Sequence, residues 1–302
     1  MPSPEMQQII DSLWQRRTAR ANAPARSLAE VRSSYAPAGQ LRPLPGDVVT
    51  EQVDADGVLA WGLTAGETDP AASAGRVLLY LHGGGYQLGS LRSHGPLAAE
   101  LGRTTRRPVI LPEYRLAPEY PFPAAVEDTL TTWRWLVTDG GADPASVVLA
   151  GDSAGGGLAL ALLHSLRNAG EGLPAGAVLI SPFLDLTASG VSLTSRAAQD
   201  PIFTPDAVRG FAAVYLNGAD PRDPAASPLL GSQKGLPPLL IQVGGAEVLL
   251  SDSERLAQAA ADAGVDVTLN VTDGMPHVYH GALETPETTA AISQIAEFTR
   301  RL

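Results

Sequence analysis

Short apolar runs alternate with stretches of helical spacing along most of the chain. The runs predict strands over Val48–Val53, Val58–Leu63, Arg76–His82, Val109–Glu113, Val147–Ser153, Ala177–Ser181, Leu239–Val243 and Val265–Val271. The intervening and flanking stretches predict helices over Glu5–Asn22, Ala124–Val137, Ala154–Ala169, Pro205–Leu216, Ser253–Ala263 and Thr288–Arg300. Continuous apolar runs are typical of strands covered on both faces. Because these strands alternate with helices, we expect an α/β fold with a mostly parallel sheet of about eight strands.

Two segments stand outside this alternation. A proline-rich stretch, Ala36–Pro45, sets residues 1–45 apart as an N-terminal arm. Residues 187–228 interrupt the rhythm between two strands, and an insertion of that length favours a functional lid over a bare loop. The remaining segments, 46–186 and 229–302, are predicted to form the core.

Composition narrows the classes of protein that fit this pattern. The 302 residues are 44% hydrophobic and 18% charged, so the chain can bury a large core. A formal net charge of −11 argues against nucleic acid or an anionic membrane surface as a partner. The absence of cysteine excludes disulfides, thiolate metal ligands and a cysteine nucleophile. With no signal-peptide pattern and no apolar run of about 18 residues, we expect a cytoplasmic protein that does not insert into membranes.

The segment Gly151-Asp152-Ser153-Ala154-Gly155 matches the G-x-S-x-G nucleophile elbow. A serine exposed at a strand-to-helix turn needs strained backbone angles and very small neighbours, which the two glycines supply. The predicted strand before Ser153 and the predicted helix after it give the required context. A glycine-rich turn without catalytic function is the alternative.

A glycine run, His82-Gly83-Gly84-Gly85-Tyr86, directly follows another predicted strand. Backbone N–H groups of Gly83 and Gly84, together with that of Ala154, are predicted to bind the oxyanion of a tetrahedral intermediate. A flexible turn or a phosphate-binding loop are the alternatives. The second of these lacks the lysine of the GxxxxGK[ST] pattern.

Five motifs together resemble the hormone-sensitive-lipase-like esterases, also called bacterial family IV. They are HGGGY at 82–86, EYRLAPE at 113–119, PAAVED at 123–128, GDSAGGG at 151–157 and SPFLDL at 181–186. The resemblance implies an α/β-hydrolase core, a helical cap built from the N-terminal helix and the insertion, and activity on short-acyl esters. It also implies that His82 supports the glycine loop and that edge strands over Val265–Val271 can pair two copies into a homodimer.

The proposed serine requires a base and an acid later in the chain. His277 follows the last predicted strand and is expected to be the base, with His280 as a rival that otherwise faces solvent or supports the site. Glu247 follows strand Leu239–Val243 and is expected to be the acid, although many family members carry Asp-Pro-Leu there. Asp252 is the rival acid, and its alternative role is the N-cap of a helix starting near Ser253.

The aromatic side chains of Tyr86, Phe203, Phe211 and Tyr215 are candidates for the substrate pocket, with core packing as the alternative. No metal and no cofactor is expected. The predicted function is hydrolysis of short-chain carboxylic esters, with lactones or acetyl esters conceivable, through a Ser-His-Glu triad and an acyl-enzyme. A superfamily member that binds small molecules without hydrolysing them, or an amidase or deacetylase, are the alternative functions.

Overall fold

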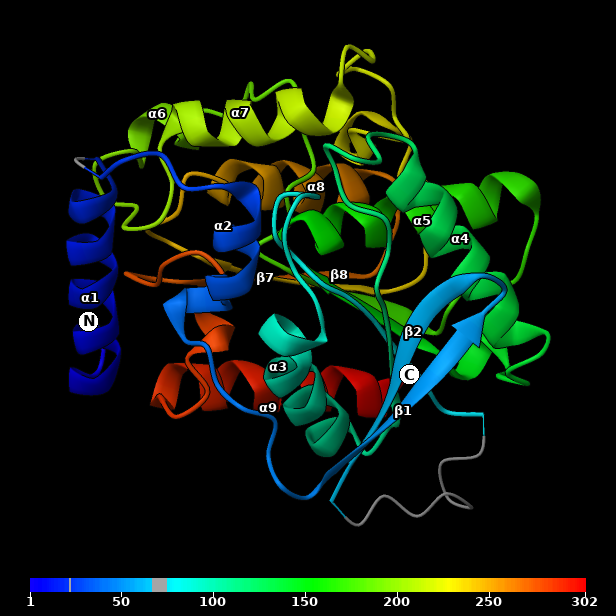
Figure 1. Ribbon diagram of the computed structural model, residues 1–302. Coiled ribbons are helices and arrows are strands. Elements are labelled where there is room, and N and C mark those ends of the chain that lie inside the picture. The colour runs from blue at the N-terminus through cyan, green and yellow to red at the C-terminus, as the bar shows by residue number, and fades with distance from the viewer. Residues whose placement is uncertain (22, 67–74) are drawn as a thin grey trace.

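An eight-stranded sheet forms the centre of the computed structural model, which describes residues 1–21, 23–66 and 75–302 (Figure 1). The strand order is β1-β2-β4-β3-β5-β6-β7-β8. Both neighbours of β2 pair with it antiparallel, and the other pairings are parallel. The strands are β1 (Val48–Ala55), β2 (Val58–Ala65), β3 (Leu78–Leu81), β4 (Val109–Pro112), β5 (Val148–Asp152), β6 (Gly176–Ile180), β7 (Leu239–Gly244) and β8 (Val267–Thr272). The predicted α/β architecture with a mostly parallel sheet is confirmed.

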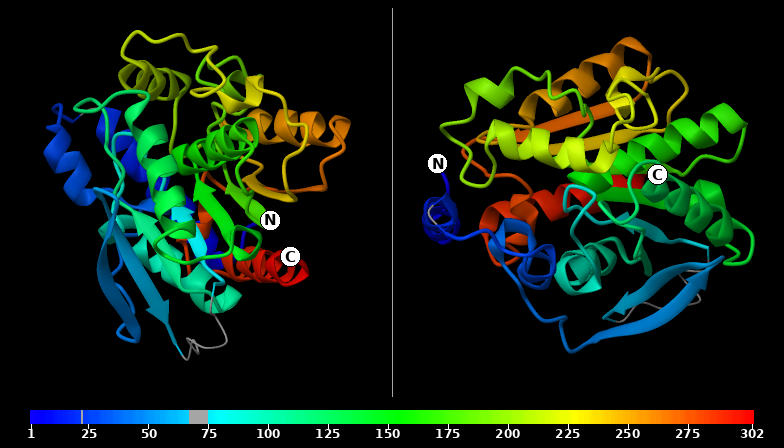
Figure 2. Two further views of the ribbon diagram at one scale, coloured as in Figure 1. Left: turned by 90° about the vertical axis from the view of Figure 1, so that its right-hand side faces the viewer. Right: turned by 45° about the horizontal axis from the view of Figure 1, so that its top comes forward.

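Helices cover both faces of this sheet (Figure 2). Buried side chains of α3 and α9 pack on one face, and those of α4, α5 and α8 pack on the other. The helices are α1 (Pro4–Ala21), α2 (Leu28–Ser34), α3 (Leu91–Thr105), α4 (Ala124–Val137), α5 (Ala154–Ala169), α6 (Ser192–Ser195), α7 (Pro205–Leu216), α8 (Leu250–Asp262) and α9 (Pro286–Arg301). Short 3-10 turns are η1 (Pro37–Gly39), η2 (Pro144–Ser146), η3 (Pro228–Leu230) and η4 (Tyr279–Gly281).

Strand β3 shows why the apolar runs are continuous. Its residues Leu79 and Leu81 belong to the core on the α5 side, whereas Leu78 and Tyr80 belong to the core on the α9 side. All four are fully buried. Alternate side chains of a strand point to opposite faces, so a strand covered on both faces needs apolar residues at every position.

Helices α2, α3 and α6 were not predicted, and α8 begins at a different residue from the one expected. Helix α3 was not predicted, because Gly95 and Pro96 in its interior are typical of a turn. Its buried leucines Leu97 and Leu101, one helical turn apart, pack on the sheet and stabilise the helix despite the proline. Helix α8 begins at Leu250 rather than near Ser253. The predicted N-terminal helix is α1, and its expected last residue, Asn22, lies outside the described residues.

The arm and the insertion lie outside the sheet. Figure 1 shows α6 and α7 along the upper side of the molecule and α1 and α2 at its left. Helix α1 packs through Met6 and Ile10 against Met275 and Tyr279, in the segment that follows β8. That the two segments form one cap stays a prediction.

Strand β8 is an edge of the sheet, as edge-to-edge pairing of two copies requires, and such a dimer stays a prediction. None of the described helices is both long and apolar enough to cross a bilayer.

Candidate active site

Ser153 occupies the sharp turn between β5 and α5. Its backbone angles are φ 52° and ψ −118°, which is strained for a residue with a side chain. The turn leaves no room for larger neighbours, because a Cβ atom on Gly155 would lie 1.9 Å from the carbonyl oxygen of Leu81. A Cβ on Gly151 would lie 2.3 Å from the Gly155 oxygen. The glycines of the motif are therefore required by the close approach of β5, α5 and β3.

Ser153, His277 and Glu247 form one row of hydrogen bonds. The imidazole Nε2 of His277 lies 2.9 Å from Ser153 Oγ, and its Nδ1 lies 2.9 Å from Glu247 Oε1. The serine is 6% exposed, the histidine 4% and the glutamate 0%. Such a row can withdraw the serine proton and hold the resulting imidazolium beside a carboxylate.

The carboxylate of Glu247 is anchored on its far side as well. Its Oε2 accepts hydrogen bonds from the N–H of Gly244 at 2.9 Å and from the hydroxyl of Ser181 at 2.7 Å. The same hydroxyl accepts a hydrogen bond from the N–H of Val278 at 3.1 Å. Burial disfavours the imidazolium, but the charge and hydrogen bond of Glu247 outweigh it and raise the pKa of His277 above its ordinary value.

The rival acid, Asp252, and the rival base, His280, form hydrogen bonds with other residues. Asp252 Oδ2 accepts hydrogen bonds from the N–H groups of Leu184 and Asp185, at 2.9 and 3.1 Å. It is not the N-cap of α8, because that helix begins two residues earlier. His280 is fully buried rather than facing solvent, and its Nε2 lies 2.8 Å from Gln242 Oε1. Neither side chain joins the row at Ser153.

The glycine loop requires a correction to the expected oxyanion donors. The N–H of Gly83 donates to Asp152 Oδ1 at 3.0 Å, so it is not free for a substrate oxygen. The next two residues, Gly84 and Gly85, have positive φ angles of 116° and 61°. Within the described part of the chain, their N–H groups and that of Ala154 have no acceptor. The glycine run predicts a loop of backbone donors but cannot indicate which N–H groups remain free, since consecutive glycines are identical in the sequence.

His82 packs beneath the loop. Its ring stacks on Tyr114, with centroids 4.2 Å apart and planes at 17°. Its Nδ1 lies 2.9 Å from the carbonyl oxygen of Gly83, and the Tyr114 hydroxyl donates to the carbonyl oxygen of His82 at 2.6 Å. Burial, with His94 nearby, lowers the pKa of His82 to about 3, so the ring is neutral. These contacts fit a supporting role for His82 rather than an acid–base role.

The four aromatic candidates divide into two pairs. Tyr86 and Tyr215 stack face to face, with centroids 3.7 Å apart, and both are buried in the core. The rings of Phe203 and His277 instead meet in a T-shaped arrangement with centroids 5.0 Å apart, and those of Phe203 and Phe211 meet in the same way at 6.0 Å. A Cβ atom on Gly85 would lie 2.3 Å from the Phe211 ring. The phenylalanines therefore contact the site, and core packing accounts for the tyrosines.

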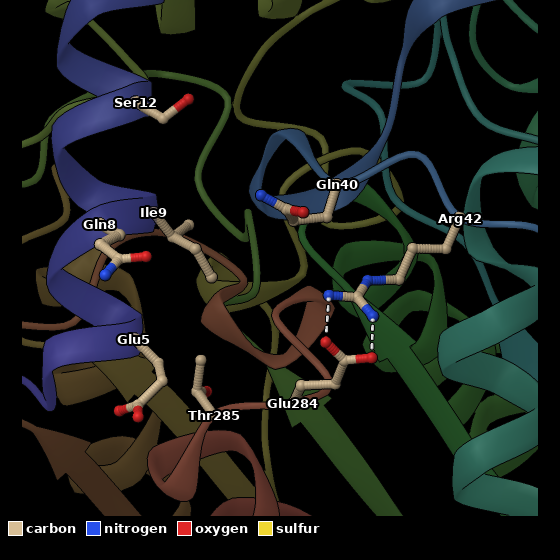
Figure 3. Close-up of a pocket in the computed structure, with 8 residues that line it drawn as sticks. All are labelled: Glu5, Gln8, Ile9, Ser12, Gln40, Arg42, Glu284 and Thr285. Carbon is tan, nitrogen blue, oxygen red and sulfur yellow. Dashed lines mark hydrogen bonds and ion pairs between the residues drawn. The ribbon is translucent and has the colours of Figure 1, made fainter.

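A surface cavity of about 430 Å³ is lined by none of the residues of this row (Figure 3). It is lined by Glu5, Gln8, Ile9, Ser12, Gln40, Arg42, Glu284 and Thr285, and the ion pair between Arg42 and Glu284 crosses one side of it. It contains none of the residues singled out from the sequence. Among residues 1–21, 23–66 and 75–302, no group of three histidine or carboxylate side chains is placed to bind a metal ion.

Reasoning from the sequence missed two buried polar residues around the row, Ser181 and Asp200. Ser181 begins the SPFLDL motif and has a positive φ of 44°. The motif does not indicate that its hydroxyl contacts the loops of Glu247 and Val278. Asp200 stands before a proline in the insertion, where an aspartate is usually a simple turn residue.

Known proteins resemble this chain over most of its length. The family model described as the alpha/beta hydrolase fold matches residues 78–281. An acetyl-hydrolase of Streptomyces hygroscopicus is 45% identical over 306 residues, covering 99% of this chain and 97% of that protein. An esterase of Acinetobacter venetianus is 37% identical over 243 residues, covering 80% of each.

A solved structure extends the likeness to three dimensions. A crystal structure of an esterase from the bacterial hormone-sensitive lipase family superposes with a TM-score of 0.90 and 42% identity, covering 100% of this chain and 99% of that one. The chain therefore belongs to the α/β hydrolases, in the hormone-sensitive-lipase-like family of carboxylic ester hydrolases.

Proposed function

We propose that this esterase hydrolyses short-chain carboxylic esters through an acyl-enzyme on Ser153, with His277 as base and Glu247 as acid. The observation that carries the proposal is the unbroken row from Ser153 Oγ through both imidazole nitrogens to Glu247 Oε1, with 2.9 Å at each step. A buried serine hydroxyl is a weak nucleophile unless a base in this position removes its proton.

The first half of the reaction forms the acyl-enzyme. Ser153 Oγ attacks the ester carbonyl carbon while its proton moves to His277 Nε2, and the carbonyl oxygen becomes an oxyanion. Backbone N–H groups of Gly84, Gly85 and Ala154 hold this oxyanion, and the position of Ala154 at the start of α5 adds the favourable end of the helix dipole. The imidazolium then gives its proton to the departing alkoxide oxygen, and the alcohol leaves.

The second half repeats these steps with water. Water gives a proton to His277 Nε2 and attacks the acyl carbon, and the same N–H groups hold the second oxyanion. When that intermediate collapses, the bond to Ser153 Oγ breaks, the proton returns to the serine, and a carboxylic acid leaves. Glu247 accepts the hydrogen bond of Nδ1 and keeps the imidazole in the tautomer whose Nε2 accepts a proton.

A short acyl group fits the surroundings of the serine. Phe203 lies against the base and Phe211 lies against the glycine loop, so two rings bound the space beside Ser153. The similar protein of Streptomyces hygroscopicus is called an acetyl-hydrolase, which supports a small acyl group. We propose acetyl to butyryl esters as the substrate class.

Replacing the nucleophile tests the proposal. Ser153→Ala should lose at least about 10⁴-fold in kcat on nitrophenyl acetate while its unfolding curve stays close to that of the unmodified enzyme. An acyl series from acetate to decanoate should show kcat/KM falling with chain length. Retained turnover in folded Ser153→Ala would refute the role of Ser153, and a preference for decanoate would refute the short-acyl assignment.

A further inference from the structure

Asp200 is a buried carboxylate of the insertion that the proposed mechanism does not use. The side chain is 0% exposed, and within the described part of the chain no cationic side chain forms an ion pair with it. Burial raises the pKa of Asp200, and the hydrogen bonds that it accepts from backbone N–H groups oppose that rise. Burying a carboxylate without a counter-ion costs free energy, and the hydrogen bonds that Asp200 accepts offset this cost.

The two oxygens of this carboxylate bind different elements. Asp200 Oδ1 accepts hydrogen bonds from the N–H groups of Ile202 at 2.7 Å and Phe203 at 2.9 Å, which closes a turn of the insertion. Asp200 Oδ2 accepts a hydrogen bond at 2.9 Å from the N–H of Val248, 48 residues away in the sequence. One side chain thus joins the insertion to the loop that follows β7.

Both ends of this bridge adjoin the proposed triad. Val248 is the residue directly after Glu247, whose Oε1 meets the imidazole. At the other end, the Phe203 ring meets that of His277 in a T-shaped arrangement at an interplanar angle of 71°. A shift of the Asp200 side chain would therefore move the backbone of the acid and release the ring that bounds the base.

The N-terminal helix α1 also contacts Asp200, through a hydrogen bond to its backbone. The guanidinium of Arg17 in α1 donates a hydrogen bond to the backbone carbonyl of Asp200. That guanidinium also lies over the ring of Trp14, 5.1 Å from its centroid, which limits its freedom. The arm, the insertion and the acid loop therefore meet at one residue.

We propose that Asp200 is a positioning residue of the esterase, which holds Glu247 and His277 in hydrogen-bonding register through Val248 and Phe203. The proposal rests on the function proposed above, since it assigns the acid and base roles to the same residues. Small misplacements of a catalytic group are expensive for the rate, so the effect should appear in kcat.

The variant Asp200→Asn separates the two ends of the bridge. A side-chain amide has one accepting oxygen, and its NH₂ group must face an N–H donor on the other side. We expect kcat per active site to fall roughly tenfold to a hundredfold on nitrophenyl acetate, with KM within about twofold. Active sites are counted by the nitrophenol burst, so a smaller folded fraction does not imitate the effect.

Asp185→Asn is the matched control. Asp185 is also buried and accepts a hydrogen bond from a backbone N–H, that of Thr187, at 2.9 Å, but it contacts no residue of the triad. Its variant should keep the kcat per active site of the unmodified enzyme, even if it unfolds at lower urea. A kcat loss of similar size in both variants, or none in Asp200→Asn, would overturn the proposal.

A second variant covers failure of the first to fold. Asp200→Ser keeps a hydroxyl that can cap the turn at Ile202 and Phe203 but is too short to reach Val248. It should show the same loss in kcat, and full kcat would overturn the proposal. If neither variant folds while Asp185→Asn does, Asp200 is a folding residue and the positioning role is rejected.

Ser153→Ala, assayed in parallel, separates the two proposals. Retained turnover there would remove the proposed function and this inference together. An inactive Ser153→Ala beside a fully active Asp200→Asn would reject only the inference.

Discussion

The proposed nucleophile and the proposed acid–base pair are held by different kinds of contact. Ser153 is fixed by backbone contacts: it lies in a turn whose glycines allow β5, α5 and β3 to approach closely, and its own N–H donates to the carbonyl oxygen of Ile180. Glu247 and His277 stand on loops after β7 and β8 and depend on side chains from elsewhere. Ser181, which binds Glu247, lies 66 residues from it in the sequence.

Because of this difference, substitutions in the two regions should affect different properties, stability in one and rate in the other. Replacing a glycine of the elbow should act through sterics and reduce the stability of the whole fold, because the added Cβ would separate β5, α5 and β3. A substitution among the distant supports should leave the fold intact and act on the rate, because it loosens one hydrogen bond beside the base. The predictions below give first the expected loss of stability and then the losses of activity in decreasing order.

Gly155→Ala tests the elbow. The added Cβ would lie 1.9 Å from the Leu81 carbonyl oxygen, so β3 or α5 must move apart. We expect a loss of about 3 kcal/mol or more in the free energy of unfolding, measured by urea titration. Gly210→Ala in α7 is the control, since nothing lies within 4 Å of its Cβ position, and it should gain up to about 1 kcal/mol from helix propensity. Equal stability of the two variants would contradict the steric account.

Glu247→Gln tests the acid. The amide oxygen can replace the carboxylate oxygen that faces Gly244 and Ser181, which turns the NH₂ group toward His277 Nδ1. That contact selects the tautomer whose Nε2 carries a proton and cannot accept another. We expect kcat to fall by about 10³–10⁴-fold with the fold retained. Full activity in this variant would return Asp252 to consideration.

Glu247→Gln should also change the pH dependence of kcat/KM. The base acts only when neutral, and Glu247 raises the pKa of His277, so the acid limb of kcat/KM in the unmodified enzyme should lie above pH 6.5, the ordinary value for an imidazole. In Glu247→Gln the carboxylate charge is absent, so the acid limb of the remaining kcat/KM should move to lower pH. Glu284→Gln, at an exposed ion pair with Arg42, should leave the limb in place. A limb that stays unchanged in Glu247→Gln would argue against the charge as its cause.

Ser181→Ala tests a distant support and should have the smallest effect. It removes a donor to Glu247 and leaves the N–H of Val278 without an acceptor. We expect kcat to fall about tenfold, equivalent to about 1.4 kcal/mol, with KM little changed. Ser253→Ala is the control, because its hydroxyl is buried without a hydrogen-bond partner in the described structure. A similar loss in the two variants would show that the location of Ser181 beside the acid is irrelevant.

The fold followed from the sequence where local pattern and tertiary environment agree. Strands covered on both faces are apolar throughout, so their runs were recognisable without the structure. Helix α3 was missed because its Gly95-Pro96 pair opposes the helix locally, and only packing of its leucines on the sheet overrides that preference. Tertiary contacts also moved the start of α8, which placed Asp252 inside the helix rather than at its cap.

The turn at Ser153 could be predicted from the sequence, because the strand, the small residues and the helix that define it are contiguous there. The positions of Glu247 and His277 after Ser153 also follow the chain order that the fold requires of an acid and a base. Two features depend on the tertiary structure. The N–H of Gly83 donates to Asp152, so that only the next two glycines keep free N–H groups. Asp200 and Ser181 form hydrogen bonds with the loop that carries Glu247. The reason is physical: a hydrogen bond of about 3 Å between distant segments depends on how strands and helices pack, and no short stretch of sequence records that packing.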